Sequence, residues 1–375
     1  MAKRKRDIES EQQAKVELEN AQVYKGEPQF AITVLMPIYN TEKYLRQALD
    51  SLVGQSFSDF EVLCINDGST DDSRAILQEY LDKDQRFQVI DKDNSGYGSS
   101  MNRGIREAKG EYIAILEPDD FFEADALQTL YDLAHESDAD VAKANYWFYW
   151  SSPKDRNQLI EVCKAPFTDA PFAPRDMQEV FFTIPSIWSA IYRRSMLLEK
   201  RVSFLETAGA SYQDMGFQFK VWCAADKVAM TSKAILHYRQ DNEASSVNDP
   251  KKAMAVVREL NSCERFIEDD ADFDKLCKLL FRLRYDSYMW NFARLDEEAR
   301  GDFFERMYKD LQRGMKERHY DASLFGGWQQ DNLKFLLSRP KKFQQFFPKK
   351  PTKFNKAIYY LIVSGPKGVM EAMRH

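Results

Sequence analysis

The sequence has no long apolar stretch, and its first residues predict no secretion leader. Its longest apolar run near the C-terminal end, Ala357–Val363, is much shorter than the ~20 residues that a transmembrane helix requires. The first ten residues, MAKRKRDIES, are charged, and polar residues continue through Asn20, which is unlike a signal peptide. These absences predict a cytoplasmic protein that has no membrane-spanning helix.

The patterns of cysteine and of charge exclude further classes. The five cysteines are odd in number and show no zinc-site spacing; they are Cys64, Cys163, Cys223, Cys263 and Cys277. Thiols of this kind are typical of a reducing compartment. The net charge is −6 and the isoelectric point is about 5.5, so the chain lacks the overall positive charge of a nucleic-acid-binding protein. We therefore expect no nucleic-acid partner.

What the sequence does contain is an alternation of short apolar runs and helical periodicity. The 375 residues are 44% hydrophobic, which leaves room for one domain of about 220 residues and a smaller helical one. Strands are predicted at Ala31–Met36, Phe60–Ile65, Phe87–Ile90 and Tyr112–Leu116, with helices between them. The alternation predicts an α/β fold with a mostly parallel sheet flanked by helices and right-handed crossovers. Polar residues at the strand ends should therefore meet at one edge.

Three carboxylates follow the fourth predicted strand, in the sequence Glu117-Pro118-Asp119-Asp120. An open α/β sheet binds its ligand at the carboxyl ends of its strands, which is where these acids fall. Clustered acids repel one another unless a cation or a proton offsets their charge, and a divalent cation that carries phosphates would do so. The alternative is that Asp119 or Asp120 caps a helix that begins near Glu123.

Four motifs together resemble glycosyltransferase family 2, whose members have the Rossmann-like GT-A fold. They are MPIYN from Met36, INDGSTDDS from Ile65, NSGYGSSMNRGIREAKGEYI from Asn94, and EPDDFF from Glu117, in the family's order and at its spacing. The resemblance covers about two-thirds of the chain. It implies transfer of a sugar from a nucleotide diphosphate sugar, usually with inversion at the anomeric carbon and with a divalent metal.

The resemblance implies a set of nucleotide-sugar-binding residues. They are Pro37, Tyr39, Asn40, Asp67, Gly96, Asn102, Arg103, Glu117, Asp119, Asp120 and Arg239. Asp67 matches the position that accepts a hydrogen bond from uracil, which favours UDP, although it could instead form an Asx turn at a helix start. Tyr39 could stack on the base or be a half-buried loop residue, and Arg103 could be a solvated helix residue. Gly96 and Gly98 would allow a ligand to approach the backbone.

The same resemblance implies a Mn²⁺ or Mg²⁺ site. Asp119 is the expected direct ligand, and Asp120 and His237 are further candidates. The family commonly has Asp-x-Asp-Asp, and here Glu117 replaces the first Asp, so Glu117 is expected to contact ribose or a metal-bound water. Arg239 would contact the diphosphate, within a segment that includes Ser245 and Ser246 and resembles the family's loop over the donor.

Catalysis and acceptor binding are expected from two later segments. Asp214 matches the family's general base, and Gln213 replaces the acid that often precedes it. Because like charges raise a carboxylate's pKa, the neutral Gln213 should leave Asp214 easier to ionise. Asp214 could instead be a helix N-terminal charge. Trp188 and Gln213 are the expected acceptor residues, with a buried core tryptophan as the alternative for Trp188.

The remaining sequence predicts helices and a basic, aromatic C-terminal segment. Helical periodicity covers Ala253–Ile267, Phe273–Leu295 and Phe303–Met315. Residues 338–375 hold nine Lys or Arg against one acid, Glu371, interleaved with aromatics. This segment could dock peripherally on an anionic membrane surface or pack on the rest of the protein. The predicted organisation is an N-terminal extension (1–29), a GT-A catalytic domain (30–248), a helical region (249–337) and this tail (338–375).

These features predict a metal-dependent, inverting glycosyltransferase that moves a sugar from a UDP-sugar to a saccharide or lipid-linked acceptor. The chain lacks the membrane spans and the Gln-x-x-Arg-Trp motif of the family's processive synthases, so it should add one or a few sugars. Two alternatives stay open. A nucleotidyltransferase would need a glycine- and lysine-rich phosphate loop where PIYNTEKY stands. A non-catalytic scaffold would keep the fold without needing Asp119, Asp120 and Asp214.

Overall fold

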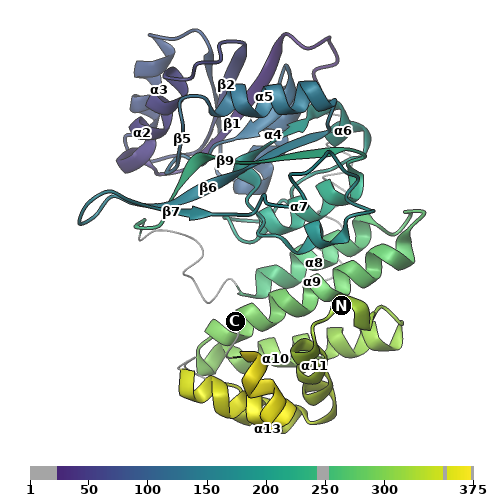
Figure 1. The fold of residues 1–375 in the computed structure, drawn as a ribbon. Coiled ribbons are helices and arrows are strands. Elements are labelled where there is room, and N and C mark those ends of the chain that lie inside the picture. The colour runs from purple at the N-terminus through teal and green to yellow at the C-terminus, as the bar shows by residue number, and fades with distance from the viewer. Residues whose placement is uncertain (1–22, 243–252, 349–352, 373–375) are drawn as a thin grey trace. The chain divides into compact units, whose positions relative to one another are not determined.

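The computed structural model describes residues 23–242, 253–348 and 353–372, and the chain forms two compact units, residues 1–246 and 247–375 (Figure 1). Within its described part, the first unit holds a nine-stranded sheet in the order β3-β2-β1-β4-β8-β6-β9-β5, with β7 paired to β6. The strands are β1 (Phe30–Ile38), β2 (Phe60–Asp67), β3 (Phe87–Lys92), β4 (Gly110–Ile115), β5 (Phe121–Phe122), β6 (Val141–Trp150), β7 (Arg156–Ile160), β8 (Ala190–Arg193) and β9 (Val228–Arg239).

The four predicted strands are confirmed as β1 to β4, and they pair in parallel as β3-β2-β1-β4. Beyond β4 the sheet is mixed: β8 is antiparallel to both β4 and β6, whereas β9 runs parallel to β6. Because helices cover β1 and β2 on both faces, both strands are almost entirely buried. β1 also extends through Pro37 to Ile38, two residues beyond the predicted end.

Helices of the first unit pack around the sheet (Figure 1). They are α2 (Glu42–Val53), α3 (Ser73–Leu81), α4 (Tyr97–Glu107), α5 (Ala126–Ser137), α6 (Arg194–Glu199) and α7 (Gln213–Ala224), with short 3-10 turns at Gln178–Phe182 and Ile187–Ser189. α2 shows the amphipathic spacing that explains its place, since Leu45, Ala48, Leu49 and Leu52 are its buried residues.

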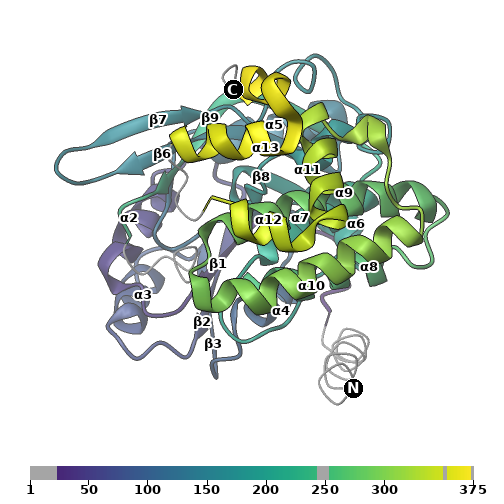
Figure 2. The same ribbon diagram turned by 90° about the horizontal axis from the view of Figure 1, so that it is seen from below.

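The second unit is helical (Figure 2). Its elements are α8 (Ala255–Phe266), α9 (Phe273–Arg294), α10 (Glu297–Lys316), a 3-10 turn (Ala322–Leu324), α11 (Gly327–Ser338), α12 (Pro340–Phe346) and α13 (Lys353–Ala372), the last kinked at Gly365. Residues 338–375 thus contribute α12 and α13 to this unit, and α13 packs on α11. No helix in the described ranges is long and apolar enough to cross a membrane.

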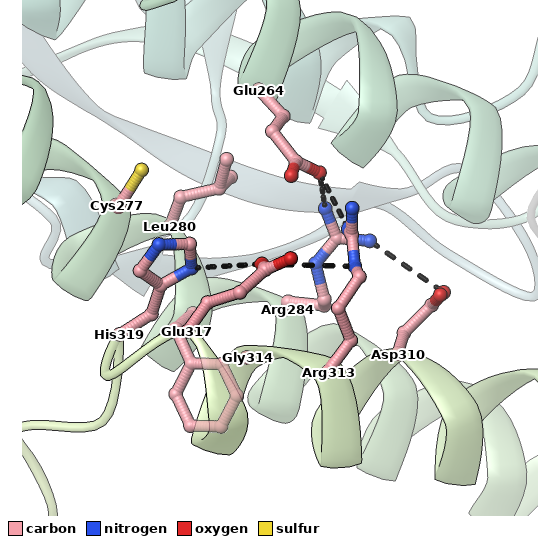
Figure 3. Close-up of a pocket in the computed structure, with 10 residues that line it drawn as sticks. Glu264, Cys277, Leu280, Arg284, Asp310, Arg313, Gly314, Glu317 and His319 are labelled. Atoms are coloured by element: carbon pink, nitrogen blue, oxygen red, sulfur yellow. Dashed lines mark hydrogen bonds and ion pairs between the residues drawn. The ribbon is translucent and has the colours of Figure 1, made fainter.

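A small pocket in the helical unit is lined by an ionic network (Figure 3). The buried guanidinium of Arg284 donates to Glu264 at 2.9 Å, and Arg313 donates to the same carboxylate at 2.8 Å. Asp310 accepts from Tyr288 at 2.6 Å and lies 3.6 Å from Arg284. Since the charges that line this pocket are paired with one another, we interpret the network as structural.

The N-terminal turn of α4 clamps the segment that leads to α7. A Cβ on Gly98 would lie 2.2 Å from the carbonyl oxygen of Leu205, and one on Gly96 would lie 2.3 Å from that of Thr207. The side-chain oxygen of Asn102 accepts from the backbone N–H of Phe204 at 2.9 Å, and its amide donates back to the Phe204 carbonyl at 3.0 Å. The glycines therefore let two backbones touch, and this contact fixes the start of α7.

Replacing Gly98 by alanine tests this contact. We expect Gly98→Ala to lower the free energy of unfolding by about 1–3 kcal/mol, because the new methyl group would meet backbone that cannot move aside cheaply. Gly301→Ala is the matched control, since nothing lies within 4 Å of a Cβ at that position in α10. It should stabilise by about 0.5–1 kcal/mol, as expected for Gly→Ala within a helix. Equal effects of the two changes in denaturant titrations would contradict this backbone contact between α4 and the segment before α7.

Candidate active site at the carboxyl edge of the sheet

The three acids that follow β4 lie in a tight turn and do not cap a helix. The backbone N–H of Leu116 still bonds to the Leu35 carbonyl at 3.0 Å, so the chain leaves the sheet just before Glu117. The N–H of Asp120 then bonds to the Glu117 carbonyl at 3.1 Å. Because α5 begins only at Ala126, with Asp125 as its N-cap, the helix-cap alternative is excluded.

Glu117 points to the N-terminal turn of α4. Its carboxylate accepts a hydrogen bond from the Tyr97 hydroxyl at 2.7 Å. Burial raises the pKa of Glu117 to about 8; the Tyr97 hydrogen bond lowers it, and the charges of Asp119 and Asp214 raise it further. Tyr97, which the motif analysis did not single out, is thus part of the site.

Asp120 is the most buried of the acids, with 1% of its surface exposed. Its Oδ1 accepts from the backbone N–H of Arg239 at 2.9 Å, whereas its Oδ2 is buried and has no hydrogen-bond partner. Burial raises its pKa well above the ordinary range, and the neighbouring charge of Asp119 adds to the shift. An unpaired buried carboxylate oxygen of this kind calls for a ligand, a cation or a proton.

Asp119 is less enclosed than Asp120. Its Oδ2 accepts from the side-chain amide of Asn242 at 2.8 Å, and its carbonyl accepts from Arg239 Nε at 2.9 Å. Its other carboxylate oxygen accepts no hydrogen bond from the residues described here. This oxygen is therefore available to an incoming cation.

Asp214 joins the same electrostatic environment from the first turn of α7. Its Oδ1 accepts from the backbone N–H of Met215 at 2.8 Å, and burial raises its pKa to about 6. The charge of Asp214 acts on Glu117 and on Tyr97. Residues almost a hundred positions apart in the sequence thus lie at one edge of the sheet.

Tyr238 is a further site residue that sequence reasoning did not assign. Burial raises the pKa of its hydroxyl, and the charges of Asp120, Asp119, Asp214 and Glu117 each raise it further. The charges of all four acids therefore act on this hydroxyl. The sequence signal was its place between His237 and Arg239, but nothing in that triplet indicated which side chain faces the acids.

The residues expected to bind the base lie at the ends of β1 and β2. Tyr39 is 51% exposed, as a stacking platform would be. Asn40 has a positive φ of 52° and accepts from the backbone N–H of Thr70 at 2.8 Å, which ties the two strand ends together. Pro37 is buried within β1 and pairs with Ile65 of β2.

Asp67 already has an ion-pair partner and hydrogen-bond donors within the protein. It forms an ion pair with Lys92 and accepts from the backbone N–H groups of Ser95 and Gly96, both at 2.9 Å. A carboxylate has about four acceptor positions, so three donors leave room for one more, such as a uracil imide N–H. The Asx-turn alternative is not observed, because its hydrogen bonds go to the segment after β3.

Other expected donor-site residues contact protein rather than open space. Gly96 is packed against Thr207, and Asn102 bonds to Phe204 and to Glu206, so the close approach expected for a ligand is made by the 204–209 backbone. Arg103 forms a partly exposed ion pair with Glu107 at 2.8 Å.

His237 and Arg239 are both enclosed on β9. The two ring nitrogens of His237 lie 2.7 Å from Glu123 and 3.0 Å from Asn157, so both already have partners. Arg239 lies over the rings of Tyr44 and Tyr149, with its guanidinium carbon 4.4 and 5.0 Å from their centroids. Its side chain holds the Asp119 carbonyl, and its backbone N–H holds the Asp120 carboxylate. Ser245 and Ser246 lie outside the described residues.

The expected acceptor residues have different environments. Gln213 is buried, and its side chain accepts from the backbone of Ser211 and donates to Thr207 at 3.2 Å, which closes the loop before α7. Trp188 is 9% exposed and stacks on Tyr238, with ring centroids 4.8 Å apart. Trp188 is thus both a largely buried residue, as the alternative held, and a neighbour of the acids.

The donor set fits a cation that phosphates would share. Among the described residues, no three His, Cys, Asp or Glu side chains converge as a complete protein-made metal site. Mg²⁺-type sites that serve nucleotides, however, use one or two carboxylates plus phosphate oxygens and water. Asp119, with an available oxygen and with Glu117 and Asp120 beside it, meets that requirement.

Comparison with known proteins agrees with this geometry. The family described as Glycosyl transferase family 2 matches residues 33–199. The chain is 31% identical over 217 residues to the glycosyltransferase GlyG of Streptococcus pneumoniae, covering 56% of this chain and 70% of GlyG. It is 30% identical over 216 residues to GlyA of the same organism, covering 56% of this chain but only 30% of that longer protein.

Among solved structures, TarS of S. aureus, crystallised with UDP-GlcNAc, superimposes with a TM-score of 0.66 at 17% identity. The match covers 84% of this chain and 90% of that one, and it shows that the fold is GT-A. With the family match, the relatives and the acids at the sheet edge in agreement, the chain belongs to glycosyltransferase family 2.

Proposed function

We propose that this protein is a non-processive, inverting glycosyltransferase that uses a UDP-sugar and a divalent cation. The observation that carries the proposal is the convergence of Glu117, Asp119, Asp120 and Asp214 on one edge of the sheet, where their charges act on one another. Such a concentration of buried negative charge is suited to a cation that carries a diphosphate. We propose a saccharide or lipid-linked hydroxyl as acceptor.

UDP is the proposed nucleotide for two reasons. Asp67 keeps one acceptor position for an imide N–H, and Tyr39 offers an exposed ring at the end of the neighbouring strand. TarS, which shares the fold, was crystallised with UDP-GlcNAc. Arg239 is proposed to act beneath the diphosphate by positioning Asp119 and Asp120, since its guanidinium is already enclosed.

Asp119 is the proposed direct metal ligand, held by Asn242 on one oxygen and open on the other. The metal, Mn²⁺ or Mg²⁺, would neutralise the charge of the diphosphate leaving group. His237 is proposed to support the site and not to bind the metal, because both its ring nitrogens already have partners. The charges of Asp119 and Asp214 act on Glu117, and its carboxylate accepts a hydrogen bond from Tyr97.

Asp214 is the proposed general base. It would remove the proton from the acceptor hydroxyl as that oxygen attacks the anomeric carbon, while the bond from that carbon to the diphosphate oxygen breaks and UDP leaves from the opposite face. A base of this kind works best when its pKa lies slightly below the operating pH, and a pKa of about 6 meets that condition.

Asp119→Asn tests the metal assignment. The neutral side chain should abolish the Mn²⁺-dependent part of UDP binding while the fold stays intact, as measured by calorimetry with and without Mn²⁺. Asp125→Asn is the control, because that nearby acid forms a surface ion pair with Lys233. Unchanged Mn²⁺-dependent affinity in the Asp119 variant would refute its role as ligand.

Asp214→Asn separates binding from chemistry. Affinity for the donor should stay near that of the parent protein, whereas turnover should fall by about two to four powers of ten, the usual contribution of a general base. In the parent protein, kcat/KM should fall about tenfold per pH unit below pH 6, because the protonated carboxyl cannot accept a proton. A variant that keeps turnover within a few-fold would place the base elsewhere.

We also propose that α13 docks on an anionic membrane surface. The aromatic residues of the segment 338–375 differ in exposure: Phe343 and Tyr359 are buried in the helical unit, whereas Phe346 is 41% exposed. Ile358, Leu361 and Ile362 are also exposed, and their spacing places them on one face of α13. Residues 338–375 contain nine basic residues and one acid, and this excess of positive charge favours an anionic lipid surface as the partner.

Surface substitutions test the membrane proposal, because removal of α12 and α13 would also remove core residues. Ile358→Asn and Leu361→Asn should each weaken co-sedimentation with anionic liposomes about tenfold, since each removes a side chain whose burial contributes roughly 1.5–3 kcal/mol. Leu159→Asn, at an equally exposed apolar site on β7, should leave it unchanged. Binding that ignores salt and lipid charge would contradict the proposal.

A further inference from the structure

Four polar groups near the acids have no hydrogen-bond partner in the part of the chain that the structure describes. Asp120 Oδ2 and Trp188 Nε1 are buried and unpaired. The hydroxyls of Tyr146 and Tyr238 make no hydrogen bond to any residue that the structure describes, although Tyr146 is 1% exposed. Buried polar groups in native proteins are nearly always paired, so the unpaired Asp120 Oδ2 and Trp188 Nε1, next to two tyrosine hydroxyls, require an explanation.

The four groups belong to one cluster. The Trp188 ring stacks on Tyr238 at a centroid distance of 4.8 Å and meets Tyr146 edge-on at 6.1 Å. Tyr146 and Tyr238 are 6.3 Å apart, also edge-on. Asp120 accepts from the backbone N–H of Arg239, the residue that follows Tyr238, and its charge adds to the burial that raises the pKa of both tyrosine hydroxyls. β6, the 187–189 turn, β9 and the turn after β4 thus bring these side chains together.

Buried polar groups that flank Trp188 do have partners. In the same region, the buried Lys143 donates to the carbonyl and the hydroxyl of Ser186 and to Ser189, so all three of its donors are used. The hydroxyl of Tyr192 likewise donates to the Ile187 carbonyl at 2.8 Å. The fold therefore satisfies polar groups on both sides of Trp188 and leaves the Trp188 indole N–H itself unpaired.

The chemistry of the cluster matches a hexose. A sugar ring presents hydroxyls that both donate and accept, and it has an apolar C–H face. The cluster offers a carboxylate acceptor, an indole donor and two phenol hydroxyls that can do either, around aromatic surfaces. A site built to hydrogen-bond a substrate hydroxyl rejects analogues that lack it, because its buried groups then stay unpaired.

We propose that Tyr146, Trp188 and Tyr238, with Asp120, form the subsite that binds the hydroxyls of a hexose and selects among hexoses. The subsite deepens the proposed function and rests on it. Tyr238 directly precedes Arg239, which bonds to Asp119 and Asp120, so the hexose would sit beside the reaction centre. The hexose could be the sugar of the donor or the terminal sugar of the acceptor, which present the same chemistry and which the experiment distinguishes.

The test uses Tyr238→Phe and Tyr146→Phe, which keep the rings and remove only the hydroxyls. Tyr112→Phe is the matched control, because the Tyr112 hydroxyl is buried and donates to the Ala139 carbonyl at 3.2 Å. In the ligand-free protein the first two changes should leave the melting temperature unchanged or raise it, since no protein partner is lost, whereas the control should lower it. A lower melting temperature in all three would show a structural role and overturn the proposal.

Calorimetry and kinetics then identify the ligand. The probes are UDP and the UDP derivatives of glucose, galactose, N-acetylglucosamine and N-acetylgalactosamine, each with Mn²⁺. If the hexose belongs to the donor, affinity for the preferred UDP-hexose should fall about five- to tenfold in each variant while affinity for UDP stays the same. If it belongs to the acceptor, donor affinity should stay constant and the KM for octyl glucoside or octyl galactoside should rise by a similar factor.

Two failures can be told apart. Parent-like donor affinity and acceptor KM in both variants would overturn the subsite and leave the proposed function standing. If the parent protein itself binds no UDP-hexose, the proposed function fails and the subsite fails with it.

Discussion

The burial of four carboxylates at one sheet edge is the constraint on which the rest of the site depends. Desolvation raises the pKa of Asp214 to about 6, and desolvation together with the charges of Asp119 and Asp214 raises the pKa of Glu117 to about 8. A raised pKa favours folding in the protonated form, so its contribution to stability is complete below the ordinary carboxyl range near pH 4 and is lost as the pH rises through 6 and 8. At neutral pH the ligand-free site therefore opposes folding, and a bound cation would relieve it.

The surrounding structure holds this unfavourable arrangement in place. Arg239, fixed between Tyr44 and Tyr149, bonds through its side chain to the Asp119 carbonyl and through its backbone to Asp120. Asn102 of α4 fixes the segment that leads to α7, which carries Asp214. The acids thus cannot move apart without disturbing β9 or α4, and a preorganised negative site is what a cation-diphosphate ligand requires.

Sequence patterns could predict the parts of this fold whose determinants are local. Strands β1 to β4 and the acids after β4 follow from runs of a few residues, and the structure confirms them. The partners of Asn102 lie about a hundred residues away, so its motif suggested a ligand where the structure has the Phe204 backbone. Tyr238 and Tyr97 were missed for the same reason, since their importance comes from acids on other elements. Phe343 and Phe346 lie in the same basic, aromatic stretch of sequence, yet tertiary packing buries Phe343 and leaves Phe346 exposed.

Two departures from the family's common motif affect the same electrostatic constraint. Glu117 replaces an aspartate, and its longer side chain reaches the Tyr97 hydroxyl, whose hydrogen bond favours the ionised form. Gln213 replaces an acid next to Asp214, and it uses both ends of its amide to close the loop before α7. A carboxylate there would lose the amide donor and would place a second carboxylate directly beside Asp214. Because like charges raise the pKa, the neutral Gln213 helps to keep Asp214 ionised at neutral pH, the state in which it can act as a base.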